Sequence, residues 1–271
     1  MEIRNNIYHN NKVRMVRGVA FYLFTLLPFC LLAFLPVGAA ARTVSKVQAD
    51  SAYAQEHEQK AAQLYEELLT TGVSADVYYN LGNAYYRQDN ITRAVLNYER
   101  ALLLSPGDAD IRFNLQMARS KTVDKITPES EMFFVTWYHS LVNMMSVDGW
   151  ARLALISLAV AIILSLAYLF ASMLWLRKLG FFGGVLAVML FLAANLFAWQ
   201  QKRALVSRKG AIIMSSAVNV KSTPAKNGTD LFILHEGTRV TITDSSMQGW
   251  REIRVADGKS GWLETSQIEV I

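Results

Sequence analysis

Apolar and small residues recur every three or four positions between residues 75 and 108, in two successive blocks. In the second block, Ala94, Tyr98 and Ala101 follow the i, i+4, i+7 spacing of one helix face. Pro106 comes soon afterwards and cannot continue a helix, because its ring removes a backbone donor and clashes with the preceding turn. The pattern therefore predicts two antiparallel helices that pack face to face and then end.

The same stretch carries the full signature of a tetratricopeptide repeat, at Tyr78, Leu81, Gly82, Tyr85, Ala94, Tyr98, Ala101 and Pro106. One such helix pair cannot bury its apolar face alone, so repeats stack and present a concave surface to another polypeptide. Residues 52–68 repeat the pattern weakly, and residues 111–118 suit a capping helix. We expect a short array over residues 50–120 whose default function is binding, not catalysis.

The side chains expected on the concave surface belong to the first helix of the repeat and to the capping helix. They are Asp76, Tyr79, Asn80, Asn83, Tyr86, Arg87, Phe113, Asn114 and Met117. Aromatic side chains provide contact area, while amides and a guanidinium can hold a peptide backbone or a carboxylate. On this interpretation, Asn83→Ala with Arg87→Ala removes partner binding and leaves thermal stability almost unchanged. The alternative is that some of these residues form only the solvated or packed face of a small array.

Three further stretches have the composition of membrane segments. Residues 1–41 begin with basic residues, continue with an apolar run and end in small residues, as a signal peptide or N-terminal anchor does. Residues 150–176 and 179–199 are each long enough to cross a bilayer, for which about 20 apolar residues suffice. Arg177 and Lys178 are expected at the turn between them, because a basic side chain at mid-bilayer costs about 2.5 to 3.5 kcal/mol.

A transmembrane hairpin returns the chain to the side it came from, so the repeats and the C-terminal region share one side of the membrane. Export by the first segment places both in the periplasm, attached to the cytoplasmic (inner) membrane of a bacterium. Four basic residues, Lys202, Arg203, Arg208 and Lys209, then lie on the outer side, against the usual bias.

The segment before the hairpin has a membrane pattern of another kind. Residues 131–147 are rich in Phe, Trp and Met around a narrow polar stripe that includes His139 and Asn143. This favours an amphipathic helix in the headgroup layer of the lipid bilayer; the alternative is a helix packed on the repeats. Residues 121–130 are polar, contain Pro128 and are expected to be a linker.

Residues 211–271 change to short alternating runs separated by turns, which predicts a small all-β barrel. The order of residues 218–224, 234–240, 250–253 and 258–262 resembles a bacterial SH3-like domain, with Lys221 in place of the usual Arg. Such domains can bind peptidoglycan or protein segments. Trp250 and Trp262 can supply an aromatic surface, although packing is the simpler role for both.

Composition removes several other function classes. The net charge of +5 is concentrated beside the hydrophobic segments, and neither soluble region has a basic face suited to nucleic acid. Cys30 is the only cysteine, so no intrachain disulfide can form. No motif for a catalytic nucleophile, a phosphate loop or a metal site occurs, so we expect neither an enzyme nor a cofactor.

The whole layout defines a multidomain membrane protein with an all-α tetratricopeptide array, a two-helix transmembrane hairpin and a small all-β SH3-like barrel. Together with residues 78–87, 97–104, 218–224 and 231–237, it resembles the BatE proteins of the Bacteroides aerotolerance operon. That resemblance implies a non-catalytic scaffold acting with von Willebrand A-domain and other tetratricopeptide membrane proteins of the same operon, in tolerance of oxygen or envelope stress. A cell-wall sensor that binds peptidoglycan through the barrel is the alternative.

Overall fold

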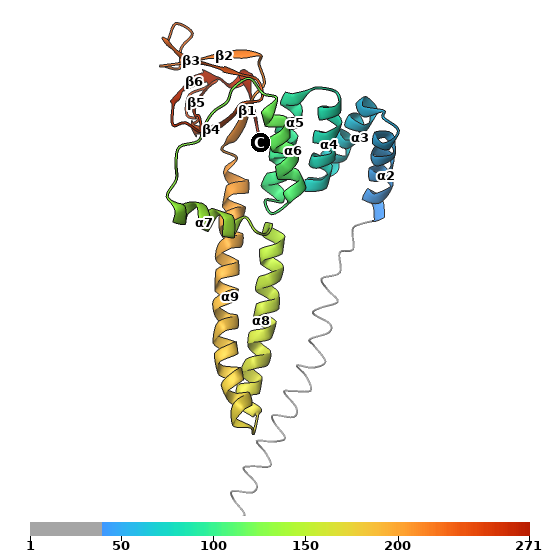
Figure 1. The fold of residues 1–271 in the computed structure, drawn as a ribbon, viewed down its shortest axis with the longest axis vertical. Coiled ribbons are helices and arrows are strands. Elements are labelled where there is room, and N and C mark those ends of the chain that lie inside the picture. The colour runs from blue at the N-terminus through green and yellow to red at the C-terminus, as the bar shows by residue number, and fades with distance from the viewer. Residues whose placement is uncertain (1–39) are drawn as a thin grey trace, which may run out of the picture. The chain divides into compact units, whose positions relative to one another are not determined.

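The computed structural model describes the backbone of residues 40–271 and the side chains from Lys46 onward. Residues 46–271 form one compact unit. It contains a helical array, two long apolar helices and a C-terminal antiparallel sheet of seven strands, which confirms the predicted fold class (Figure 1). Most of the predicted signal or anchor segment, including Cys30, lies outside the described residues.

The array consists of consecutive helices joined by short turns: α2 (Ala40–Ala54), α3 (Glu58–Thr71), α4 (Ala75–Arg87), α5 (Ile91–Leu104) and α6 (Ala109–Ser120). N-cap side chains define where two of these helices, α5 and α6, begin. The side chain of Asn90 accepts a hydrogen bond from the backbone N–H of Arg93, and Asp108 accepts from Asp110 and Ile111. Such caps satisfy backbone donors that the first helical turn leaves unpaired.

The repeat core forms from the positions that the helical spacing indicates. Ala94, Tyr98 and Ala101 on α5 are buried, and so is Leu81 on α4. Gly82 permits the two helices to approach closely, since a Cβ atom there would lie 2.6 Å from the ring of Tyr98. Small residues opposite a large ring therefore determine the spacing of α4 and α5.

The two long apolar helices are α8 (Val147–Phe170) and α9 (Leu174–Ser207), and each is long and apolar enough to cross a membrane by length and composition. The chain reverses at residues 171–173, so Arg177 and Lys178 lie in the first two turns of α9 and not in the loop where we expected them. Both side chains are exposed there, and a long basic side chain near a helix end can extend toward water. Tight packing continues along the pair, because a Cβ atom at Gly180 would lie 2.7 Å from the backbone of α8.

The C-terminal sheet contains β1 (Gly210–Ile213), β2 (Ala217–Lys221), β3 (Asp230–His235), β4 (Arg239–Asp244), β5 (Trp250–Arg254), β6 (Ser260–Glu264) and β7 (Ile268–Val270). The strand order is β3-β2-β6-β5-β4-β1-β7. Inward positions alternate with outward ones, so Val220, Ile253 and Leu263 are fully buried in its core. Only Arg208 and Lys209 separate α9 from β1, and Arg208 has the left-handed φ of 40° that ends the helix.

Candidate functional site

The predicted binding residues all lie on α4 and α6, on the side of the array that also includes α2. Asp76, Arg87, Phe113 and Met117 are exposed. Tyr79, Asn80, Asn83, Tyr86 and Asn114 are partly buried. The structure thus brings the nine predicted residues to one region and divides them into an accessible group and a packed group.

The packed group forms a polar network that joins α4, α5 and α6. Asn83 Oδ1 accepts hydrogen bonds from the Tyr98 hydroxyl at 2.7 Å and from Asn114 Nδ2 at 3.0 Å. Asn114 Nδ2 also donates to the Tyr79 hydroxyl at 2.8 Å. Since the oxygen of Asn83 already has two internal donors, its removal is expected to destabilise the array, contrary to our expectation for Asn83→Ala.

A second cluster joins α4 to α2 and α3, and it involves a residue that the sequence analysis did not select. Asp50 Oδ1 accepts hydrogen bonds from the Tyr65 hydroxyl at 2.7 Å and from Asn80 at 3.3 Å, and Asp50 Oδ2 accepts from Lys46 at 2.8 Å. Burial alone would raise the pKa of Asp50, but these three donors outweigh it and hold the pKa below its ordinary value. Asn80 is therefore an internal bridging residue as well.

On the accessible part of this side of the array, two cationic side chains lie over tyrosine rings. The Arg87 guanidinium is 4.2 Å from the ring centre of Tyr53, and Lys121 Nζ is 4.4 Å from that of Tyr86. Phe113, Met117 and Lys121 follow i, i+4, i+8 spacing along and just beyond α6, and Phe113 is 65% exposed. We call Tyr53, Tyr86, Arg87, Phe113, Met117 and Lys121 the repeat face. The sequence analysis did not select Tyr53 and Lys121 as binding residues, because their interaction partners, Arg87 and Tyr86, lie on a different helix, α4.

The two predicted tryptophans lie on adjacent strands of the C-terminal domain. Trp250 is paired with Glu264 and Trp262 with Glu252, so the tryptophans are diagonal neighbours that point to the same side of the sheet. Both are partly exposed, and neither belongs to the buried core. They form a small aromatic surface separate from the repeat face.

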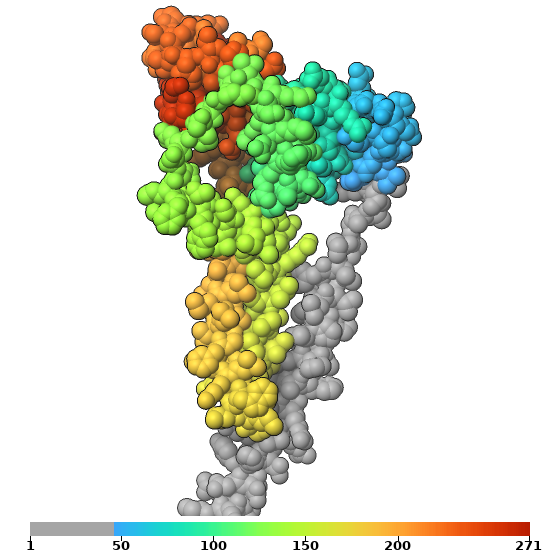
Figure 2. Space-filling view, viewed as in Figure 1, coloured from blue at the N-terminus to red at the C-terminus, as the bar shows by residue number. Residues whose placement is uncertain are grey.

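The predicted linker is attached to the C-terminal domain. Asp124 Oδ2 accepts hydrogen bonds from the backbone N–H of His235 and from the Thr238 hydroxyl, both at 2.7 Å, and Asp124 Oδ1 lies 2.8 Å from His235 Nδ1. Ile126 packs against the sheet core, and Glu129 N–H donates to the Ala256 carbonyl at 3.0 Å. Figure 2 shows this green segment against the orange and red C-terminal domain. We call residues 122–130 the strap.

The C-terminal domain also contacts the second helix of the repeat. Glu99 on α5 is only 5% exposed and pairs with Arg119 on α6 and, at 3.3 Å, with Arg239 on β4. Arg100 binds Glu269 at 2.8 Å and the Val270 carbonyl at 2.7 Å. These contacts leave the repeat face on the other helices uncovered.

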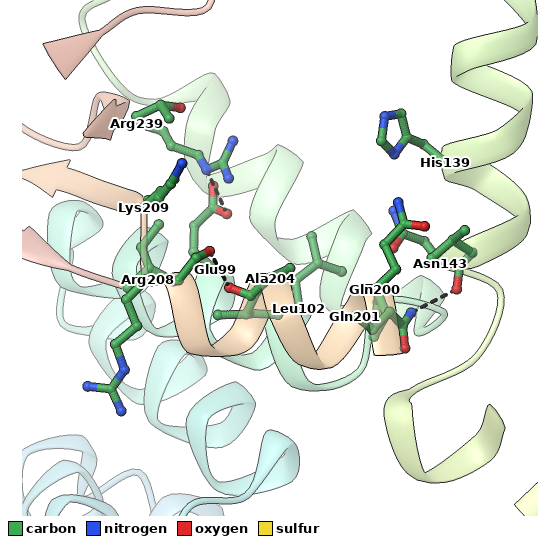
Figure 3. A pocket seen from close by; sticks show the side chains of 17 residues that line it. Glu99, Leu102, His139, Asn143, Gln200, Gln201, Ala204, Arg208, Lys209 and Arg239 are labelled. Atoms are coloured by element: carbon green, nitrogen blue, oxygen red, sulfur yellow. Dashed lines mark hydrogen bonds and ion pairs between the residues drawn. The ribbon is translucent and has the colours of Figure 1, made fainter. Parts of the chain in front are cut away.

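A cavity of about 410 Å³ lies where α5, α7 (Phe133–Val142), α9 and β1 meet. Figure 3 shows Glu99, Lys209 and Arg239 at one end and His139, Asn143 and Gln200 at the other. Between these ends, its wall includes Leu102 and Ala204. The sequence analysis did not predict this cavity, because its lining comes from five separate elements, with β4 contributing Arg239 and Thr241.

α7 packs on the hairpin. The Tyr138 hydroxyl donates to Gln200 Oε1 at 2.5 Å, and Trp150 Nε1 donates to the Val142 carbonyl at 2.8 Å. Phe133 is 85% exposed and Trp137 is 67% exposed. Figure 1 shows α7 lying across α9 and not along it, as a helix in a membrane surface does when α9 spans the membrane.

Comparison with known families assigns both soluble regions. A family model for the tetratricopeptide repeat matches residues 75–108, and a model for the bacterial SH3 domain matches residues 216–269. No curated protein matched the chain. Among the described residues, no three His, Cys, Asp or Glu side chains are grouped in a way that could hold a metal ion.

The two domains together support a protein-interaction or scaffold role. The two apolar helices are consistent with a membrane protein. The class defined by fold and site is therefore an interaction protein with a helical repeat, a bacterial SH3 domain and an apolar helix pair.

Proposed function

We propose that this protein is a non-catalytic membrane scaffold that captures a segment of a partner membrane protein on its repeat face. The proposal rests on one observation: the side chains on the α2, α4 and α6 side of the array divide into a packed group and an accessible group. Asn83, Asn114 and Asp50 are used by internal hydrogen bonds. By contrast, Phe113 is exposed, and Arg87 is exposed over the ring of Tyr53. Exposed aromatic and arginine side chains are the residue types that most often dominate binding energy at protein interfaces.

The membrane part of the proposal rests on α7, α8 and α9. The hairpin spans the cytoplasmic membrane, α7 lies in the outer headgroup layer, and both soluble domains are periplasmic. The bacterial SH3 domain supports a location outside the cytoplasm. The resemblance to BatE proteins suggests von Willebrand A-domain and other tetratricopeptide membrane proteins as partners, in an aerotolerance or envelope-stress complex.

Site-specific photo-cross-linking in intact cells tests the repeat face. A photoreactive amino acid at Phe113 is expected to give a discrete cross-linked band, because this side chain would lie within the partner contact. The same amino acid at exposed Gln63 on α3, on the second helix of its pair, is the matched control. Equal bands from both positions would show that the partner does not select the repeat face.

Arg87→Ala with Phe113→Ala is expected to weaken partner binding at least tenfold, since each hot-spot side chain contributes more than about 1 kcal/mol. Neither side chain is buried, so the melting temperature of the purified double variant should stay close to that of the wild type. Co-purification of the cross-linked partner at several protein concentrations measures the change. Unchanged binding in a folded double variant would overturn the assignment of the face.

A second candidate function is peptidoglycan binding, for which Trp250 and Trp262, on the same side of the sheet, would be the contact surface. If this surface is used, we expect the full chain in detergent to sediment with purified peptidoglycan. Trp250→Ala with Trp262→Ala is then expected to abolish this sedimentation. The full chain is the right reagent, because an isolated C-terminal domain lacks the strap and its Ile126 contact with the core. Failure of the full chain to sediment would remove this candidate, and sedimentation that is independent of both tryptophans would remove the assignment to this surface.

A further inference from the structure

We propose that the cavity between α5, α7, α9 and β1 binds the phosphate-bearing headgroup of an anionic phospholipid. Its volume of about 410 Å³ falls in the range usual for small-ligand sites. The inference goes beyond partner capture by the repeat face, but it rests on the proposed membrane placement of α8 and α9.

The charge at one end of the cavity favours an anion. Lys209 and Arg239 line this end together with one carboxylate, that of Glu99. Arg208 also lines the cavity, and its guanidinium extends away from these three side chains in Figure 3. Glu99 is already neutralised by Arg119 and by Arg239 Nε. Within the described part of the chain, the side chains of Arg208 and Lys209 have no hydrogen bond or ion pair, so two positive charges remain uncompensated. A phosphate group can supply the missing counter-charge.

The position of the cavity along α9 favours a lipid as the source of that phosphate. Trp199 is exposed on α9, and tryptophan is enriched where a spanning helix leaves the hydrocarbon. Gln200 and Gln201 follow Trp199 immediately and line the end of the cavity opposite Arg239. Ser207 lies eight residues beyond Trp199, about 12 Å along the helix at 1.5 Å per residue. The headgroup layer is about 5 to 7 Å thick on each side, and long basic side chains can extend down to it.

The remaining walls suit the rest of a headgroup. His139, Asn143 and Gln200 provide polar contacts at the end opposite Glu99 and Arg239, on the right in Figure 3. Leu102 and Ala204 form an apolar wall between the two ends, suitable for the carbon atoms of a glycerol unit. Basic pockets beside membrane helices are a known mode of anionic lipid recognition. Two of the four basic residues that oppose the usual charge bias, Arg208 and Lys209, thereby acquire a role.

The test uses the full chain, purified in a non-ionic detergent and titrated with short-chain phosphatidylglycerol under native mass spectrometry. We expect one lipid to bind, and Arg208→Gln with Lys209→Gln to weaken it about 25-fold, since each basic residue near an anionic headgroup contributes about fivefold. Lys202→Gln with Arg203→Gln is the matched control. It removes the same charge from the last turns of α9, close to Arg208 and Lys209 in the sequence, but neither residue lines the cavity. The control pair should weaken binding less than threefold.

Three results would overturn the proposal. An equal loss of lipid affinity in the two double variants would show general attraction to basic residues and not a defined site. Equal affinity for phosphatidylcholine and phosphatidylglycerol would remove anion recognition. Saturation by inorganic phosphate at the same concentration as the lipid would assign the site to a free phosphate. A chain that stays dispersed without detergent would instead refute the membrane placement, whereas loss of partner capture alone leaves the lipid result unaffected.

Discussion

Replacing Tyr98 by alanine is expected to lower the free energy of unfolding of the repeat array by about 3 to 5 kcal/mol. The ring is only 1% exposed and fills the space that Gly82 leaves on α4. Burial raises the pKa of Tyr98, so its hydroxyl remains protonated and donates to Asn83 at 2.7 Å. Thermal melting of the purified full chain in detergent, followed by the helical circular dichroism signal, measures the loss.

Tyr98→Phe separates the ring from the hydroxyl. It keeps the buried volume and removes only the donor to Asn83, which still accepts from Asn114. The expected loss is therefore about 1 kcal/mol. If Tyr98→Phe destabilises the array as much as Tyr98→Ala, the polar network and not the ring holds α4 to α5, and the packing account given for Gly82 is wrong.

The repeat core could be predicted from the sequence because its determinants are local. The i, i+4, i+7 spacing and the sizes of Gly82, Ala94 and Tyr98 specify two helices and their contact. The roles of Asn83 and Asn114 could not be predicted in the same way. An amide on a helix surface is available for a partner or used internally, depending on distances to residues of other helices. Only the structure supplies those distances.

The strap was missed for a related reason. Residues 121–130 are mostly polar and contain Pro128, so the local pattern indicates a linker. The stabilising contacts are long-range, since Asp124 meets His235 and Thr238 more than a hundred positions later.

The hairpin turn shows a different limitation. The charge argument placed Arg177 and Lys178 in the loop, but exposed basic side chains are tolerated inside the first two turns of α9.

The strap and the α5 contacts give the C-terminal domain a structural role that is independent of any ligand. Ile126 packs on the sheet core, and Glu99 and Arg100 connect α5 to β4 and to the C-terminal strand region. The sheet is thus fixed both to the segment that follows the array and to the array itself. For a scaffold, this arrangement holds the repeat in one geometry while the repeat face stays accessible.

Replacing Asp124 by alanine is accordingly expected to lower the free energy of unfolding by about 2 to 4 kcal/mol near pH 7, because hydrogen bonds to a buried charged group are the strongest class. The carboxylate is 15% exposed and has the backbone N–H and ring of His235 and the Thr238 hydroxyl as partners. Its removal should also increase amide hydrogen exchange in the strap and in the turn from β3 to β4. Thermal melting and hydrogen exchange of the full chain in detergent measure the two effects.

The effect of Asp124 should depend on pH in a defined direction. Burial alone would raise the pKa of Asp124, but the donors from His235 and Thr238 outweigh it and lower the pKa. A carboxyl group with a lowered pKa stabilises the fold fully above its unfolded value, near 3.9, and loses that contribution as pH falls through the folded value. The difference in melting temperature between wild type and Asp124→Ala should therefore shrink as pH falls below about pH 4.

Asp244→Ala is the matched control for this titration. Asp244 also belongs to the C-terminal domain and has a lowered pKa, owing to hydrogen bonds from the backbone and side chain of Ser246. These partners lie two residues away, so Asp244 orders its own turn and connects no distant segments. Its removal should leave hydrogen exchange in the strap unchanged. A wild-type advantage over Asp124→Ala that persists undiminished at pH 3 would show that the charge of Asp124 does not hold the strap, and packing of Ile126 would then be the principal attachment.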